Sequence, residues 1–174
     1  MRPWFPNRSE GPAVAKTLRC RTGSPEETRL LGRALGASLR PGGFVGLEGK
    51  LGSGKTVLVQ GVAEGMGFDG YVTSPTFVIV NEYDARVPIL HVDLYRIADT
   101  RELEDIGYRE IYFTEGVALV EWADRAPEFL PPDRIEVVIG IAGREERDIE
   151  FTAFGEEGEA ALERLREARG DGRC

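Results

Sequence analysis

The glycine-rich stretch at residues 49–56 constrains the fold more than any other part of the chain. It has the form G-x-x-x-x-G-K-T, and it lies between an apolar run at 44–47 and a helix-like run at 57–63. A strand, a glycine loop and a helix in that order predict a phosphate-binding loop. Glycines let successive backbone N–H groups face one anion, and the start of the helix adds a partial positive charge. We therefore expect Lys55 to contact the β- and γ-phosphates of a nucleotide and the Thr56 hydroxyl to hold Mg²⁺.

Length and charge narrow the classes of protein that the chain can represent. Its 174 residues suit one domain with a sizeable core, and its formal net charge is −8. A protein that binds a nucleic acid backbone without a partner protein usually has a basic face. No long basic run is present, so we expect any contact with RNA to come through a partner. Because neither a membrane span of about 20 apolar residues nor a signal peptide is recognisable, we expect a cytoplasmic protein without membrane contact.

Turn signals and hydrophobic periodicity predict an α/β fold. Ser24 is placed to cap a helix that has Pro25 in its first turn and Glu27 in a capping box. A turn at 84–86 separates two β-rich runs and predicts an antiparallel hairpin. The further strands are expected at 16–21, 44–47, 116–122, 134–141 and 147–154, and the helices at 25–39, 57–65, 100–113 and 156–169. The predicted fold is a P-loop NTPase-like mixed sheet flanked by helices, with a C-terminal β-hairpin.

Two acidic residues stand at the ends of apolar strands. Asp93 follows the run 89–92, and Glu121 follows the run 117–120. A phosphate loop that acts on ATP needs a carboxylate near the metal and another group that orients the nucleophile. Ligands of open α/β sheets bind outside the carboxyl ends of the strands, where both acids are expected to lie. We therefore assign Lys55, Asp93 and Glu121 as candidate catalytic residues.

Three neighbouring residues have simpler interpretations. Glu82 is a weaker third acid, and we expect it to be solvated. Trp122, beside Glu121, is expected to be a core residue. His91 lies in a β-rich run, where a histidine with its hydrogen bonds satisfied in the core or on the sheet surface is the expected role.

Five motifs in a fixed order resemble the TsaE family (older name YjeE), bacterial ATPases of the tRNA threonylcarbamoyladenosine pathway. They are L-G-S-G-K-T at 51–56, T-S-P-T-F at 73–77, N-E-Y at 81–83, H-V-D-L-Y-R at 91–96 and E-W at 121–122. The phosphate loop is shared by many families, whereas the other motifs in this order are specific. The resemblance runs from about residue 24 to residue 154, and it leaves the N-terminal extension outside.

The resemblance implies a small ATPase that joins the TsaB and TsaD proteins, which place the threonylcarbamoyl group on adenosine 37 of tRNAs that read codons beginning with A. It implies ATP or ADP and Mg²⁺ as cofactors, with tRNA contacted only through the complex. Thr56 and Glu121 would hold the metal, and the 74–77 loop would sense the γ-phosphate near Asp93. The implied nucleotide-binding residues are Thr28, Gly52, Ser53, Gly54, Lys55, Thr56, Val57, Thr76 and Arg144, of which Thr28 and Arg144 would lie near the base and ribose.

The sequence pattern and the family resemblance together predict how the chain is divided. We expect a flexible extension at 1–15, a P-loop ATPase domain at 16–155 and a charged helix and tail at 156–174. One departure from the family pattern is Lys50, which stands where the family often has an acid. An extra cation there either alters nucleotide affinity or partner docking slightly, or is only a solvated lysine.

Other functions remain open at this level. A small-molecule kinase uses the same loop, but such kinases usually carry an arginine-bearing lid, and no segment after Glu121 has that pattern. A GTPase is disfavoured because the chain has no Asn-Lys-x-Asp motif. A nucleotide-gated assembly factor, in which hydrolysis acts only as a timer, is partly compatible with the family resemblance.

Overall fold

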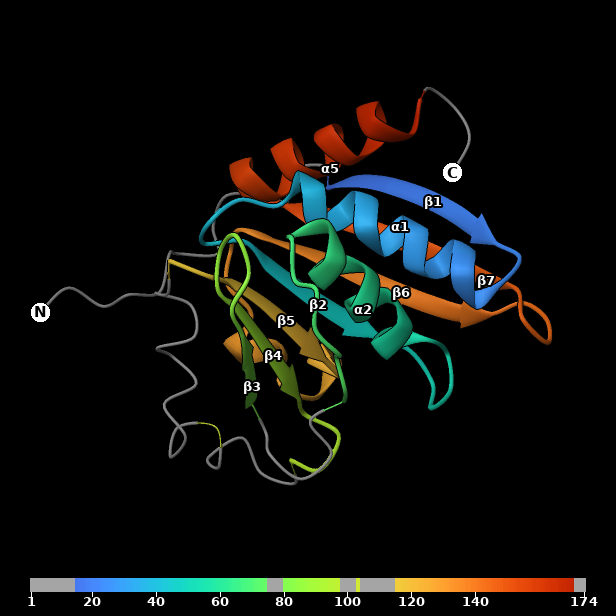
Figure 1. Cartoon of the computed structure of the whole chain (residues 1–174), viewed down its shortest axis with the longest axis horizontal. Coiled ribbons are helices and arrows are strands. Elements are labelled where there is room, and N and C mark those ends of the chain that lie inside the picture. The colour runs from blue at the N-terminus through green and yellow to red at the C-terminus, as the bar shows by residue number, and fades with distance from the viewer. Residues whose placement is uncertain (1–14, 75–79, 98–102, 104–114, 171–174) are drawn as a thin grey trace, which may run out of the picture.

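A seven-stranded mixed sheet organises the computed structural model, which describes residues 15–74, 80–97, 103 and 115–170 (Figure 1). The strand order is β1-β7-β6-β2-β5-β4-β3. The elements are β1 (Lys16–Thr22), α1 (Pro25–Ser38), β2 (Phe44–Glu48), α2 (Lys55–Gly65), β3 (Val80–Tyr83), β4 (Ile89–Asp93), β5 (Val117–Glu121), two short 3₁₀ helices η1 (Ala123–Arg125) and η2 (Pro127–Phe129), β6 (Arg134–Ile141), β7 (Arg147–Phe154) and α5 (Gly155–Arg169).

The central strand β2 brings the phosphate loop to the edge where the acidic strands end. It runs parallel to β5 and β6, and Leu47 is in register with Glu121. The next strand, β4, is parallel to β5, and Asp93 is in register with Glu121. The two acids therefore stand side by side at the edge from which the loop emerges. This arrangement confirms the predicted α/β mixed sheet and its β6–β7 hairpin.

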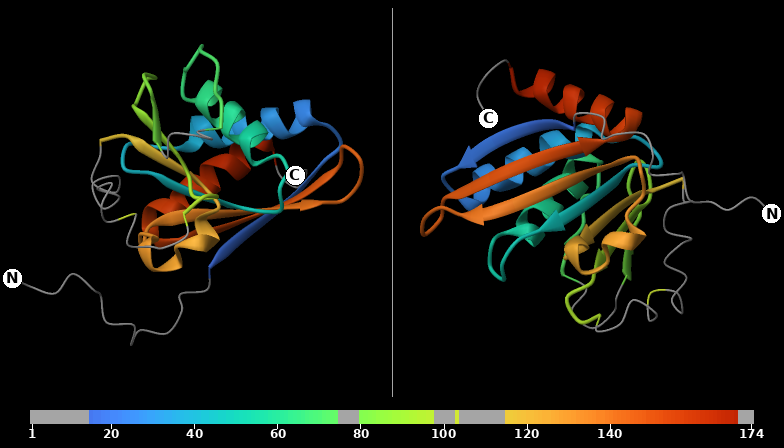
Figure 2. Two further views of the ribbon diagram at one scale, coloured as in Figure 1. Left: turned by 90° about the horizontal axis from the view of Figure 1, so that it is seen from below. Right: turned by 180° about the vertical axis from the view of Figure 1, so that it is seen from behind.

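Helices α1, α2 and α5 lie on the same face of the sheet (Figure 2). Alternation along β2 divides the core between the two faces. Val45 and Leu47 point into the larger cluster with these helices, and Phe44 points into a second cluster that includes Ala123 of η1. Leu162 and Leu165 of α5 are buried in the larger cluster, so the charged C-terminal helix packs on the sheet.

The start of α1 is fixed by the cap that the sequence predicts. The Ser24 hydroxyl accepts a hydrogen bond from the Glu27 N–H at 3.2 Å, and Pro25 occupies the first turn. The Glu27 carboxylate accepts from the N–H of Gly23 at 2.7 Å, one residue before the cap itself. The junction between β1 and α1 is therefore held from both sides of Ser24.

Two pairs of glycines let α1 and α2 approach each other unusually closely. Each pair has the spacing G-x-x-x-G, at positions 32 and 36 of α1 and at positions 61 and 65 of α2. A Cβ atom at Gly36 would lie 2.1 Å from the Val62 carbonyl oxygen, and one at Gly61 would lie 2.0 Å from the Arg29 carbonyl oxygen. Backbone therefore packs on backbone. This contact fixes the position of α2, the helix that begins at Lys55.

Some sequence-based predictions lie outside the described residues. They are the helix expected at 100–113 (apart from Leu103), the extension before residue 15, the end of the tail, and Thr76. None of the helices in the described ranges combines the length and the apolar composition that a membrane span requires.

Candidate nucleotide-binding site

The loop between β2 and α2 has the backbone shape that wraps around an anion. Gly49, Gly52 and Gly54 have φ values of 147°, 76° and 101°, in the left-handed range that favours glycine. Gly54 is also the N-cap of α2, and no side chain caps the helix there. The first N–H groups of α2 are thus left without a side-chain acceptor, and a phosphate oxygen is the group that such a helix start favours.

Two residues, Ser53 and Arg147, add to the description of the loop. The Ser53 side chain is fully buried, and its hydroxyl has no hydrogen-bond partner among the described residues. Outside the loop, the Arg147 guanidinium donates from Nε to the Ser53 carbonyl at 2.7 Å and from Nη2 to the Gly52 carbonyl at 3.3 Å. Arg147 thus holds the loop by its carbonyl groups and does not occupy the N–H groups that would bind an anion. Sequence reasoning missed this arginine.

Lys55 is 4% exposed, and its ammonium group lies inside the loop. It donates to the Gly49 carbonyl at 2.8 Å and to the Lys50 carbonyl at 3.2 Å. Burial lowers the pKa of Lys55, whereas the nearby carboxylates of Glu121, Asp93 and Asp124 act in the opposite direction. A phosphate would offer this charge stronger acceptors than two neutral carbonyls, so the lysine fits the predicted role.

Trp122 packs against the second core cluster, as expected, but it also contacts the loop lysine. Its ring centroid lies 3.7 Å from the Lys55 ammonium, which is close enough for a cation–π interaction. Its φ of 62° makes it the one non-glycine residue with positive φ in the described part of the chain. Such a conformation in a bulky residue is strained, and strain of this kind is concentrated at functional sites.

Glu121 joins the phosphate loop to the sheet. The carboxylate is 3% exposed, and the Thr56 hydroxyl lies 3.1 Å and 3.3 Å from its two oxygens. On its other side, the Nε2 atom of His91 lies 2.9 Å from Oε1. The family resemblance implies that Thr56 and Glu121 hold one metal ion, and in the structure their side chains are in direct contact. The histidine contact was not predicted.

Asp93 is the second acid at this edge. Its Oδ2 accepts from the Ser74 hydroxyl at 2.8 Å, and its Oδ1 accepts from the Tyr95 N–H at 2.9 Å. Ser74 belongs to the segment predicted to sense the nucleotide, so this acid is tied to that segment. Glu82, by contrast, is exposed, as expected of a solvated acid.

The residues present fit a magnesium ion that is shared with phosphates. No group of three or more His, Cys, Asp or Glu residues in the described ranges could hold a metal by itself. Mg²⁺ in phosphate-handling sites is bound by one or two protein oxygens together with phosphate oxygens and waters. The Thr56 hydroxyl and the Glu121 carboxylate are a suitable pair of such ligands.

The remaining residues predicted to bind the nucleotide, Thr28, Arg144 and Val57, lie in different environments. Thr28 is 2% exposed, and its hydroxyl lies 2.7 Å from the Thr22 hydroxyl. Thr22 is in register with Arg147, which contacts the loop, so this junction adjoins the candidate site. Arg144 is exposed in the β6–β7 turn, and Val57 is half-buried in the first turn of α2.

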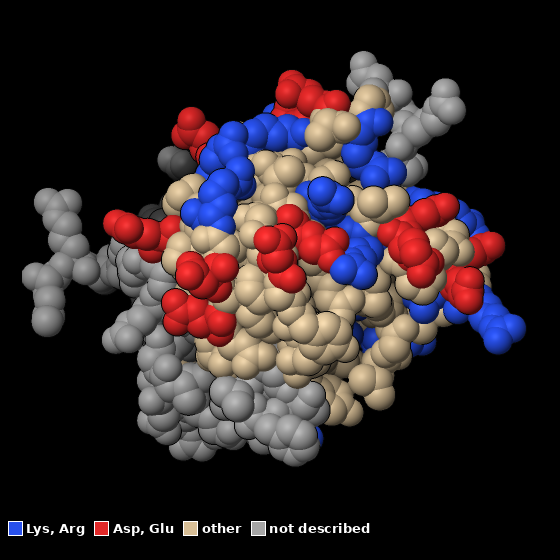
Figure 3. Space-filling view, viewed as in Figure 1, with Lys and Arg blue, Asp and Glu red and all other residues tan. Residues whose placement is uncertain are grey.

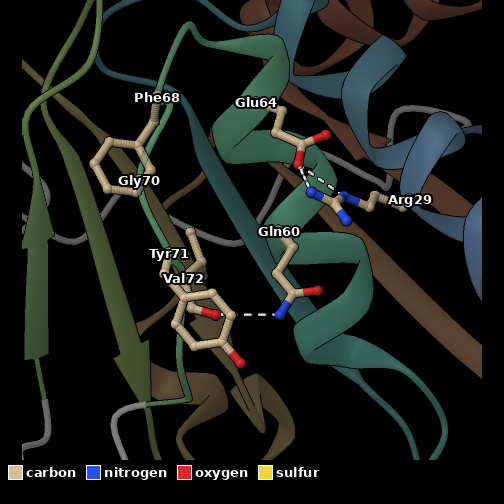
Figure 4. Close-up of a pocket in the computed structure, with 7 residues that line it drawn as sticks. All are labelled: Arg29, Gln60, Glu64, Phe68, Gly70, Tyr71 and Val72. Carbon is tan, nitrogen blue, oxygen red and sulfur yellow. Dashed lines mark hydrogen bonds and ion pairs between the residues drawn. The ribbon is translucent and has the colours of Figure 1, made fainter.

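A separate pocket lies between α1, α2 and the segment that follows α2 (Figure 4). It contains the Arg29–Glu64 ion pair and a hydrogen bond of 3.1 Å from Gln60 to the Val72 carbonyl. Tyr71, at its edge, is 82% exposed. No residue of the phosphate loop lines this pocket, so it is distinct from the nucleotide-binding site.

Comparisons with known proteins agree on one family. The family model described as "Threonylcarbamoyl adenosine biosynthesis protein TsaE" matches residues 22–149. The tRNA threonylcarbamoyladenosine biosynthesis protein TsaE of Bacillus subtilis is 46% identical over 151 residues, which cover 86% of this chain and 94% of that protein. The TsaE protein of Treponema pallidum is 34% identical over 132 residues, covering 76% and 98% of the two chains.

A solved structure is similar over almost the whole fold. The crystal structure of YdiB from Bacillus subtilis superposes with a TM-score of 0.75 at 38% sequence identity. The match covers 91% of this chain and all of that chain, so the sheet and helices described above are shared with a solved protein.

Proposed function

Because the chain belongs to the TsaE family of threonylcarbamoyl adenosine biosynthesis proteins, we propose that it binds and hydrolyses ATP as an accessory protein of TsaB and TsaD. In this role it supports the formation of the threonylcarbamoyl group on adenosine 37 of tRNAs, in the cytoplasm. One observation carries the proposal: the partly buried contact between Thr56 and Glu121 lies near Lys55, at the edge of the sheet where β4 ends at Asp93.

Each residue of the site has a distinct task in this proposal. The N–H groups of the loop and Lys55 bind the phosphates, and Thr56 and Glu121 hold the metal. Mg²⁺, when bound, neutralises charge on the β- and γ-phosphates. Asp93 accepts a hydrogen bond from the attacking water and orients it, because it stands next to Glu121 in register. Ser74 donates a hydrogen bond to Asp93. It therefore links the orientation of the water to the 74–77 loop, which is proposed to sense the γ-phosphate.

Charge supports an indirect contact with tRNA. The chain has a net charge of −8, and acidic and basic side chains alternate over the helical face shown in Figure 3. Affinity for a phosphate backbone comes mainly from clustered lysines and arginines that displace counterions. We therefore propose that TsaB and TsaD hold the tRNA and that this protein binds them according to its nucleotide state. Only a segment that contacts the γ-phosphate, which ADP lacks, can make that assembly depend on whether ATP or ADP is bound.

The test is ATP turnover by the pure protein, alone and with TsaB, TsaD and tRNA. The proposal predicts slow turnover by the protein alone, faster turnover with the partners, and no tight tRNA binding by the isolated chain. Turnover that the partners do not change, together with tight and salt-sensitive tRNA binding by the protein alone, would contradict it. Phosphate transfer to nucleosides or metabolites in a substrate screen would favour the small-molecule kinase instead.

A further inference from the structure

A chain of hydrogen bonds leads from the Thr56–Glu121 contact into the sheet and back to the segment that begins at Thr73. His91, in the middle of β4, is fully buried. Its Nε2 lies 2.9 Å from Glu121 Oε1, and its Nδ1 lies 3.4 Å from the hydroxyl of Tyr83. That hydroxyl lies 3.1 Å from the carbonyl oxygen of Thr73.

We propose that His91, supported by Tyr83, is a positioning residue that holds the Glu121 carboxylate in the orientation needed to bind the nucleotide's metal. This inference rests on the proposed nucleotide function. It goes beyond that function because it assigns a task to two buried side chains that do not touch the phosphate loop.

The hydrogen-bonding capacity of each group sets the direction of the contact between His91 and Glu121. An ionised carboxylate only accepts hydrogen bonds. The Glu121 oxygens therefore accept one hydrogen bond from the Thr56 hydroxyl and one from His91 Nε2–H. A neutral imidazole with its proton on Nε2 presents Nδ1 as an acceptor, and the Tyr83 hydroxyl is the group within reach of it. The contact with Glu121 thus selects one tautomer of His91.

His91 contacts the Glu121 carboxylate from the side opposite Thr56. Thr56 would bind Mg²⁺ through a lone pair of its hydroxyl oxygen, and it has only one proton with which to donate to Glu121. Among the described residues, His91 Nε2 is the second side-chain donor observed on this buried carboxylate. A buried carboxylate oxygen that lacks a hydrogen-bond donor costs free energy, and its orientation is poorly fixed. His91 supplies both the hydrogen bond and the orientation.

Tyr83 connects the metal ligand to the second acid. Its hydroxyl has one proton and two acceptors within reach, the Thr73 carbonyl and His91 Nδ1. Asn81 Nδ2 donates to the same hydroxyl at 3.3 Å. The residue after Thr73 is Ser74, which donates to Asp93. Glu121 is therefore linked through His91 and Tyr83 to the Thr73 carbonyl, and Asp93 is linked to the side chain of the next residue, Ser74.

The experiment measures how strongly Mg²⁺ improves ADP affinity, as the ratio of the calorimetric Kd in EDTA to the Kd in Mg²⁺. Loss of a residue that orients a metal ligand commonly reduces metal affinity by about 10–100-fold. We expect His91→Leu to lower the ratio by about that factor while the affinity in EDTA stays near wild type. Tyr83→Phe, which keeps the ring against Phe68, should lower the ratio by a smaller factor. A merely structural role for His91 would change the melting temperature and leave the ratio as it is.

Two further variants of His91, to glutamine and to asparagine, control for an effect of misfolding on the ratio. The amide nitrogen of glutamine reaches the place of Nε2, whereas that of asparagine reaches only the place of Nδ1. His91→Gln should therefore keep a ratio at least about tenfold above that of His91→Asn. Equal ratios in the two variants, or a wild-type ratio in His91→Leu, would overturn the positioning role. If the wild-type protein does not bind ADP at all, the proposed nucleotide function fails instead.

Discussion

Replacing Glu121 with glutamine is expected to reduce ATP turnover in the presence of TsaB and TsaD by about 10²–10³-fold, and to reduce ATP binding far less. The carboxylate is 3% exposed and faces donors from both Thr56 and His91. Glutamine keeps the shape but removes the charge, and its amide NH₂ would face one of those donors. Most of the loss should appear in kcat, because the metal and the reacting phosphate depend on that charge in the transition state.

The matched control is Glu82→Gln, the same substitution at an exposed position of β3. It should leave turnover unchanged. Asp93→Asn should resemble the Glu121 variant, since Asp93 stands in register with Glu121. Normal turnover in both the Glu121 and the Asp93 variants, with partners present, would remove these acids from the site.

Replacing Gly61 with alanine is expected to destabilise the fold by more than any surface substitution. The new Cβ would lie 2.0 Å from the Arg29 carbonyl oxygen and 3.0 Å from the Arg33 nitrogen, so the backbone of α1 has to move. Overpacking of a tight contact typically costs about 1–3 kcal/mol of stability. Because the nearest atoms at Gly61 are backbone atoms, which cannot rotate away, we expect a cost at or above the upper end of that range. The better helix propensity of alanine offsets only about 1 kcal/mol. Thermal unfolding should show a melting temperature lower by about 4–8 °C.

Gly140→Ala is the control for that experiment. A Cβ at Gly140 would lie 3.5 Å from the Asp148 carbonyl oxygen, an ordinary contact on the open face of β6. Its melting temperature should stay within about 2 °C of wild type. An unchanged melting temperature for Gly61→Ala would contradict the close backbone packing of α1 on α2. Reduced nucleotide affinity in that variant is also expected, because α2 begins at Lys55.

Features encoded by neighbouring residues could be predicted from the sequence. Alternation along 134–141 and 147–154 gave the bounds of β6 and β7, and the Ser24 cap gave the start of α1. The phosphate loop and the two strand-end acids came from the same kind of pattern. Parallel neighbours in a sheet place their carboxyl ends together, and for this reason Asp93 and Glu121 could be expected at one edge.

Features that depend on strand register could not be predicted. A shift of β4 by one residue would move His91 to the opposite face, away from Glu121. The contact of Arg147 with the loop crosses 94 residues of sequence, and no local pattern indicates it. Positive φ is common for glycine but not for tryptophan. No sequence pattern therefore predicts the backbone conformation of Trp122 or its contact with Lys55. The glycine pairs of α1 and α2 become meaningful only when the two helices are seen together.

Calorimetric titration of wild-type protein, Lys55→Ala and Lys50→Ala with ATP and Mg²⁺ tests most directly whether residues 49–56 bind nucleotide phosphates. Lys55 is buried inside the loop, whereas Lys50 is exposed on it, so the two lysines form a matched pair. A charge-assisted contact to phosphate is worth about 1.5–3 kcal/mol, so Lys55→Ala should bind about 10–100-fold more weakly. Lys50→Ala should stay within about threefold of wild type. Wild-type affinity in Lys55→Ala would contradict the assignment of the phosphate site.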